Sequence, residues 1–185
     1  MIKGLVRMKK VDVIANFFIS LGMSESESED YMTNLRLNKL MYFAQAWSLV
    51  LRNKPLFHEP IEAWPLGPVI PSVYHKYKNY GKSQITTLDP RFQLQLLDAE
   101  EQQILFATMA YYGEYSTHGL VDLSHEEGSP WTLACGANNA VIQADDMRAF
   151  FAKKPPLKIS GVDDDLPVVG VRDANGNYVL PVDWK

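Results

Sequence analysis

Apolar residues recur at three- and four-residue steps along most of the chain, which is the spacing of one face of an α-helix. The pattern predicts helices over residues 10–21, 31–52, 72–80, 98–113, 116–123 and 145–153, with another opening at Pro130-Trp131. Gly22 and Gly81 follow two of these segments and Gly113 ends a third, as glycines at helix ends commonly do. Asp98, with Glu101 three positions later, predicts a capping box at a helix start. We therefore expect a mostly α-helical chain.

The helix predicted over residues 31–52 is apolar on several faces. Its main stripe consists of Leu37, Leu40, Met41, Ala44, Trp47 and Leu51, and further apolar side chains lie on other faces. A helix that is apolar on several sides is usually central to its domain. We therefore predict that this helix lies in the core and that Gln45 and Trp47 are internal.

Helical periodicity stops between residues 54 and 71, where five prolines occur. They are Pro55, Pro60, Pro65, Pro68 and Pro71. Prolines at this density exclude a helix and leave short extended pieces joined by turns. Gly67-Pro68 marks one turn, and Pro71 suits the first turn of the next helix. The sequence therefore predicts a proline-rich loop between two helices.

The pattern changes again after Pro155-Pro156. Two β-prone pieces flank Asn175-Gly176, which predicts a hairpin within residues 168–180. The expected fold is a single compact bundle of about six or seven helices, with a proline-rich loop and a small C-terminal β-hairpin. We assign residues 1–154 to the helical domain and residues 155–185 to a C-terminal tail.

Composition and charge narrow the class of protein. The 185 residues suit one domain, and 46% apolar residues can fill its core. A net charge of −4 argues against binding to duplex nucleic acid, which depends on basic groups, although a local basic patch stays compatible with it. A single cysteine suits a reducing compartment, and the strongest apolar run, 40–51, is about half of a bilayer span. We expect a cytoplasmic protein without a membrane partner.

The histidines form no complete catalytic or metal-binding pattern in the sequence. His125-Glu126-Glu127 resembles part of an acid–base group, and His118 precedes it by seven residues. The spacing of a zinc protease helix and the serine elbow of hydrolases are both missing from the sequence. Cys135 fits a small core residue better than a reactive thiol. We predict no enzyme, metal or cofactor, with a hydrolase that uses His125 and Glu126 as an alternative.

One block of sequence carries a family resemblance. Residues 35–47 read Leu-Arg-Leu-Asn-Lys-Leu-Met-Tyr-Phe-Ala-Gln-Ala-Trp, followed by Pro-Ile-Glu-Ala-Trp at 60–64 and Gly-Pro-Val-Ile-Pro-Ser-Val-Tyr at 67–74. Together with the segment 123–131, this resembles the Panacea domain, the SocA-like family that includes phage-associated GepA proteins. The likeness covers about residues 10–153. It departs at Asn38, where the family often has glutamine.

The resemblance implies an antitoxin of a toxin–antitoxin system that neutralises a cognate toxin by direct protein–protein binding. It also implies a role as a proteolytic adaptor that delivers the toxin to a Clp-type protease. A DNA-binding autoregulator is a further alternative. No pattern in the sequence indicates an oligomeric state.

Candidate contact residues come from the proline-rich loop and the following helix. Aromatic anchors carry much of the energy of protein interfaces, and prolines lower the cost of ordering a loop. The candidates are Trp64, Pro68, Val69, Pro71, Tyr74 and Tyr77. For Trp64 and Tyr77, a core position that holds the loop to the helix is an equal alternative.

Overall fold

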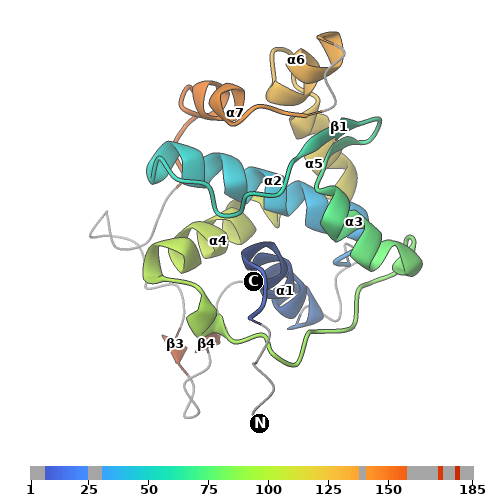
Figure 1. The fold of residues 1–185 in the computed structure, drawn as a ribbon, viewed down its shortest axis with the longest axis vertical. Helices are drawn as coiled ribbons and strands as arrows, with labels where there is room; N and C mark the ends of the chain where they lie inside the picture. Colours follow the sequence, from blue (N-terminus) through green and yellow to red (C-terminus); the bar gives the residue numbers. More distant parts are fainter. Residues whose placement is uncertain (1–6, 25–30, 138–140, 158–170, 173–177, 180–185) are drawn as a thin grey trace.

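The computed structural model describes residues 7–24, 31–137, 141–157, 171–172 and 178–179. Within these residues the chain forms seven α-helices, two short 3-10 helices and two pairs of short strands (Figure 1). The helices are α1 Lys10–Ser24, α2 Asn34–Leu51, α3 Pro71–Tyr77, α4 Ala99–Tyr112, α5 Thr117–Ser124, α6 Pro130–Gly136 and α7 Ala144–Phe151. The 3-10 helices are η1 Lys78–Tyr80 and η2 Leu94–Leu96. The predicted mostly helical fold is therefore confirmed.

Helix α2 lies in the middle of the bundle, as its all-round apolar character predicted. It contacts α1, α3, α4, α5 and α7, and it crosses the centre of the view in Figure 1. From Asn34 to Leu49 every residue except Leu35 is buried, Gln45 and Trp47 included. Leu51 is the last residue of α2 and departs from its predicted place in the buried apolar stripe, with 39% of its surface exposed.

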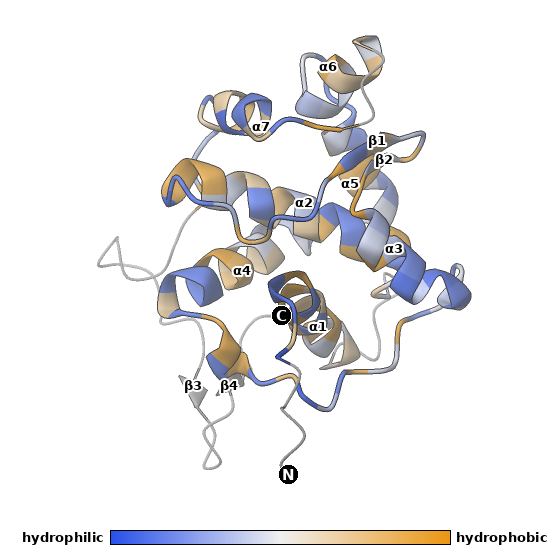
Figure 2. Cartoon of the chain, in the orientation of Figure 1, coloured by the Kyte–Doolittle hydropathy of each residue, from blue (hydrophilic) through white to orange (hydrophobic). Residues whose placement is uncertain are grey.

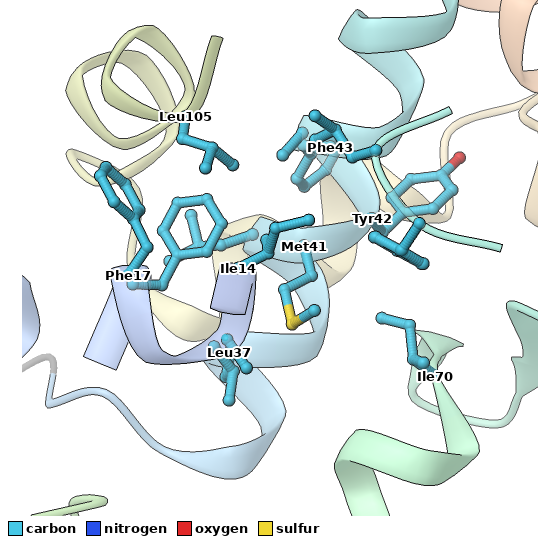
Figure 3. Packing of buried hydrophobic residues seen from close by; sticks show 14 of the residues in the cluster. Ile14, Phe17, Leu37, Met41, Tyr42, Phe43, Ile70 and Leu105 are labelled. Atoms are coloured by element: carbon cyan, nitrogen blue, oxygen red, sulfur yellow. The ribbon is translucent and has the colours of Figure 1, made fainter. Parts of the chain in front are cut away.

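The hydrophobic core lies where α1, α2 and α4 meet. Ile14 of α1, Leu37 of α2 and Leu105 of α4 are fully buried there, and Figure 3 shows them within one packed group of side chains, with Ile14 between the other two. Phe17 and Phe106 add an edge-to-face contact between α1 and α4, with ring centroids 4.9 Å apart. Figure 2 shows hydrophobic residues on these helices and a mostly hydrophilic α3. The core thus leaves α3 at the edge of the molecule.

Local capping chemistry sets the helix starts. Helix α2 begins three residues later than predicted, because the Thr33 hydroxyl caps it by accepting from the backbone N–H of Arg36 at 3.2 Å. The capping box of α4 is confirmed: Asp98 accepts from the Glu101 N–H at 2.8 Å, and Glu101 accepts from the Asp98 N–H at 2.9 Å. Ser116 caps α5 as predicted.

Replacement of Asp98 by alanine is expected to lower the free energy of unfolding by about 1 kcal/mol, the usual effect of losing an N-cap side chain. Asp98→Asn keeps a capping oxygen and serves as the matched control, with a loss of a few tenths of a kcal/mol. Urea denaturation followed by circular dichroism measures both. Equal losses in the two variants would assign the effect to the exposed ion pair of Asp98 with Arg52 instead of to the cap.

The short strands form two separate antiparallel pairs. Strands β1 Glu62–Trp64 and β2 Gly67–Val69 lie in the proline-rich segment, where the sequence predicted extended pieces and turns. Strands β3 Val171–Arg172 and β4 Tyr178–Val179 fall within the predicted C-terminal hairpin, whose Asn175-Gly176 turn lies outside the described residues. The domain boundary at residue 155 stays a prediction.

Among the described helices, none combines the length and the apolar character that a bilayer crossing requires.

Candidate partner-binding site

Polar side chains of α2 hold the proline-rich segment against the helix. Near the C-terminal end of α2, the Ser48 hydroxyl donates to the carbonyl oxygen of Lys54 at 2.7 Å. One turn earlier, Gln45 accepts from the N–H of Leu56 at 2.8 Å and donates to the carbonyl of Phe57 at 3.0 Å. Proline lacks a backbone N–H, so a proline-rich segment cannot satisfy its backbone groups through a regular ladder of backbone hydrogen bonds. Side chains of α2 supply these hydrogen bonds instead.

The same arrangement continues toward the N-terminal end of α2. Lys39 Nζ donates to the carbonyl oxygen of Pro68 at 2.8 Å. Asn38 Oδ1 accepts from the N–H of Ile70 at 2.8 Å. The asparagine at the position where the sequence departs from the family therefore binds the backbone of the segment. The segment therefore runs antiparallel to α2, and we call this set of side chains (Asn38, Lys39, Gln45 and Ser48) the polar ladder.

The polar ladder presents the β1–β2 hairpin at the surface. Trp64 pairs with Gly67 across the two strands, and Pro65 and Leu66 form the turn between them. Gly67 has φ +94°, and a Cβ there would lie 2.6 Å from Ser124 Oγ and 2.8 Å from Lys39 Cε. Only glycine suits this position, because both its backbone conformation and its close approach exclude a side chain. Leu66, at the tip, is 60% exposed.

Three aromatic rings gather beside the hairpin. The Trp64 ring meets Tyr74 of α3 edge to face, with centroids 4.8 Å apart, and His75 lies 5.4 Å from Tyr74. The indole N–H of Trp64 donates to Glu62 at 2.7 Å, which fixes the orientation of its ring. We call Trp64, Leu66, Tyr74 and His75 the hairpin surface.

The structure separates the six predicted contact residues into two groups. Trp64, Pro71 and Tyr74 are partly exposed, and Trp64 and Tyr74 lie together. Pro68, Val69 and Tyr77 are buried within the chain, and Val69 and Tyr77 keep 5% of their surface. Burial also raises the pKa of the Tyr77 hydroxyl to about 12. Pro68 and Val69 lie in the buried strand β2 of the hairpin, whereas the Tyr77 ring lies beside Tyr80 and away from the hairpin.

Sequence reasoning missed two residues of the hairpin surface. Leu66 is the tip of the turn and His75 is exposed beside Tyr74. The Pro-Leu-Gly sequence at 65–67 marks a turn, and a large apolar residue inside a turn is a detectable signal for an exposed contact. No comparable signal distinguishes His75.

Helix α6 and the residue after α5 support the hairpin from a second side. Trp131 of α6 donates its indole N–H to the carbonyl oxygen of Trp64 at 2.9 Å. The His125 ring stacks on Trp131, with centroids 3.7 Å apart and planes 19° from parallel. Burial lowers the pKa of His125, and the nearby positive charge of Lys39 lowers it further. His125 thus joins the support of the hairpin.

The predicted alternative of a hydrolase requires His125 and Glu126 to act together. The carboxylate of Glu126 instead pairs with Lys154 at 2.5 Å, while His125 Nε2 is buried and finds no hydrogen-bond partner within the described part of the chain. His118 is exposed on α5. Over the residues that the structure describes, no group of three His, Cys, Asp or Glu side chains could hold a metal ion.

Cys135 is exposed, which corrects the prediction of a small core residue. Helix α6 has seven residues and buries Pro130 and Ala134. Cys135 follows Ala134 directly, so it lies about 100° further round the helix and faces away from the core.

A pocket of about 150 Å³ lies away from the hairpin surface, where α2, α4 and α7 meet. Its walls are largely aromatic and its lining includes the Glu126–Lys154 ion pair. The lining aromatic residues are Phe43, Trp47, Tyr111, Tyr112, Phe150 and Phe151. The predicted contact residues do not line this pocket.

Comparisons with known proteins match the part of the chain that builds the hairpin surface. The family model described as "Antitoxin SocA-like, Panacea domain" matches residues 37–132, which include most of α2, the hairpin and Trp131. Antitoxin SocA of Caulobacter vibrioides (strain NA1000 / CB15N) is 32% identical over 111 residues, covering 55% of this chain and 59% of that protein. No solved structure matches. The family match spans just over half of the chain, which therefore belongs to the antitoxin SocA-like, Panacea domain family.

Proposed function

We propose that this protein is an antitoxin that neutralises a cognate toxin by direct binding through the hairpin surface. The observation that carries the proposal is a solvent-facing apolar and aromatic hairpin, held rigidly by the polar ladder, inside the span that matches the antitoxin family. The proposal rests on this geometry together with the family, because the matched relative is itself an antitoxin.

The hairpin surface has the physical properties of a protein-binding site. Large aromatic and apolar side chains at the centre of an interface contribute most of its binding energy. Trp64 and Tyr74 are already fixed by ring contacts and hydrogen bonds, and Leu66 projects at the turn. A preformed surface loses little conformational entropy when a partner binds. The proposed contacts are therefore Trp64, Leu66, Pro71, Tyr74 and His75, with Pro68 and Val69 of the buried strand β2 behind them.

Co-expression tests the function directly. The product of the adjacent open reading frame is expressed alone and together with this protein, and cell growth and co-purification are measured. We expect growth arrest with the adjacent product alone, recovery on co-expression, and a stable complex. An adjacent product that is harmless alone and does not co-purify would refute the antitoxin assignment.

Leu66→Arg is expected to weaken binding to the adjacent product at least tenfold, because a charge placed in an apolar contact must be desolvated without a partner. The free energy of unfolding should change by less than about 0.5 kcal/mol, since Leu66 is exposed. Leu51→Arg, at the exposed end of α2, is the matched control and should bind normally. Titration calorimetry measures the affinities. Equal affinity of the two variants would place the contact elsewhere.

Delivery of the bound toxin to a Clp-type protease, which the family resemblance implies, extends this proposal. An adaptor needs a second accessible surface, and Tyr111, 53% exposed beside the aromatic pocket, supplies a candidate. The expected result is a short toxin half-life in cells only when this protein and an intact Clp-type protease are both present. An unchanged half-life after deletion of the protease would leave direct masking as the mechanism.

A further inference from the structure

The amine of Lys39 occupies an unusual place for a charged group. The residue is fully buried on α2, and its hydrogen bond goes to the backbone carbonyl of Pro68. No carboxylate forms an ion pair with it in the parts of the chain that the structure describes. Burial accordingly lowers the pKa of the amine to about 7.

This amine costs the fold stability that an apolar side chain would not. An unpaired buried charge must either remain desolvated or give up its proton, and both lower the free energy of unfolding. A methionine of similar length would fill the same space without that cost. Residues that are costly for folding are commonly retained for function. The amine of Lys39 is therefore better explained by what it holds than by core packing.

What the amine holds is the strand that carries the hairpin surface. Pro68, its acceptor, pairs with Ala63 in the β1–β2 hairpin, next to the Trp64–Gly67 pair. The lysine side chain also lies directly beneath Gly67, where a Cβ would approach Nζ to 3.1 Å. The hydrogen bond of the amine thus fixes the distance between the hairpin and α2. Trp131 and Asn38 fix its two ends through Trp64 and Ile70.

We propose that Lys39 is a positioning residue for partner binding: its buried amine anchors the Pro68 carbonyl and holds the β1–β2 hairpin in the geometry that the partner recognises. This rests on the proposed function, because the hairpin surface is the proposed contact. It adds a specific role for the lysine of the family-matched span, which acts through the hairpin and does not itself touch the partner.

Lys39→Met tests the proposal, with Leu40→Met as the matched control on the neighbouring buried residue. Hydrogen–deuterium exchange of residues 62–70, the thermal midpoint and the affinity for the adjacent gene product are measured. For Lys39→Met we expect at least tenfold faster exchange over residues 62–70, at least tenfold weaker binding, and a thermal midpoint equal to or above that of the parent. Leu40→Met should leave the exchange and the binding unchanged.

Gly67→Ala approaches the same contact from the hairpin side, since its Cβ would push against Lys39 Cε. It should accelerate exchange over the same residues, and this supplies a second readout if Lys39→Met folds poorly. Parental exchange rates over residues 62–70 in a folded Lys39→Met variant would overturn the proposal, and so would a Lys39→Met variant that fails to fold while Gly67→Ala exchanges normally. If the parent does not bind the adjacent product, the proposed function fails, but the exchange data still decide whether Lys39 positions the hairpin.

Discussion

Replacement of Phe43 by alanine is expected to lower the free energy of unfolding by about 3–5 kcal/mol, the usual range for removing a buried phenylalanine. The Phe43 ring is 2% exposed and stacks on Tyr112 of α4, with centroids 4.1 Å apart and planes 7° from parallel. It also meets Phe151 of α7 at 6.0 Å. The substitution therefore opens a cavity where three helices are joined, and those helices cannot close around it without losing their other contacts.

Urea denaturation followed by tryptophan fluorescence and circular dichroism measures this loss. Phe150→Ala is the matched control, because Phe150 lies next to Phe151 on α7 but is only partly buried. It should cost clearly less than Phe43→Ala. Comparable losses at the two positions would indicate that packing around Phe43 relaxes more completely than the stacked geometry suggests.

A rise in stability between about pH 7 and pH 9 is the second large effect that we expect. The pKa of Lys39 falls from 10.5 in the unfolded chain to about 7 in the folded protein. Between these values the unfolded chain holds a proton that the folded protein has released, so the free energy of unfolding increases with pH. The linkage relation gives a gain of about 2 kcal/mol over this interval. Below pH 7 the contribution of Lys39 becomes constant.

Other titrating groups act outside this window. The pKa of His125 is lowered below its ordinary value, so its contribution is confined to more acidic pH. The pKa values of Tyr77 and Tyr112 are raised by burial, so they reduce stability only as the unfolded chain loses its tyrosine protons near pH 10.

Urea denaturation of the parent and of Lys39→Met at several pH values isolates the lysine. The difference in unfolding free energy between the two proteins should shrink by about 2 kcal/mol from pH 7 to pH 9, with Lys39→Met relatively more stable at the lower pH. A constant difference across the interval would show that the amine keeps its ordinary pKa in the folded protein.

Both predictions concern α2, which serves as core and as scaffold at once. Its apolar residues, such as Phe43, join α4 and α7, while its polar ladder carries the hairpin surface. Stability and partner recognition are therefore coupled through one helix. Variants at Lys39 and Leu66 distinguish effects on partner recognition from effects on stability. Lys39→Met acts on the position of the hairpin, and Leu66→Arg acts on the exposed contact.

Local features were predictable from the order of residues along the chain. The capping box of Asp98 and Glu101 and the cap at Ser116 each join residues three positions apart, so short-range rules apply directly. The central place of α2 followed from its apolar residues on several faces. The proline-rich segment was recognisable as non-helical, because proline removes backbone donors and fixes φ.

Only the tertiary structure decided what the site is made of. Lys39 meets Pro68 across 29 residues and Trp131 meets Trp64 across 67, and no periodicity encodes such partners. Burial of Pro68 and Val69, and exposure of Leu66, depend on which side of the hairpin faces α2, and burial of Tyr77 depends on how α3 packs against α1 and α2. Residue order thus determined where the helices lie, the caps at Asp98 and Ser116 and the break at the prolines, because those depend on neighbouring residues, whereas it missed the Thr33 cap of α2 and placed the end of α1 at Gly22, two residues too early. The contact surface depends on hydrogen bonds between polar groups that are far apart in the sequence. These form only in the folded chain, where buried donors and acceptors must be paired.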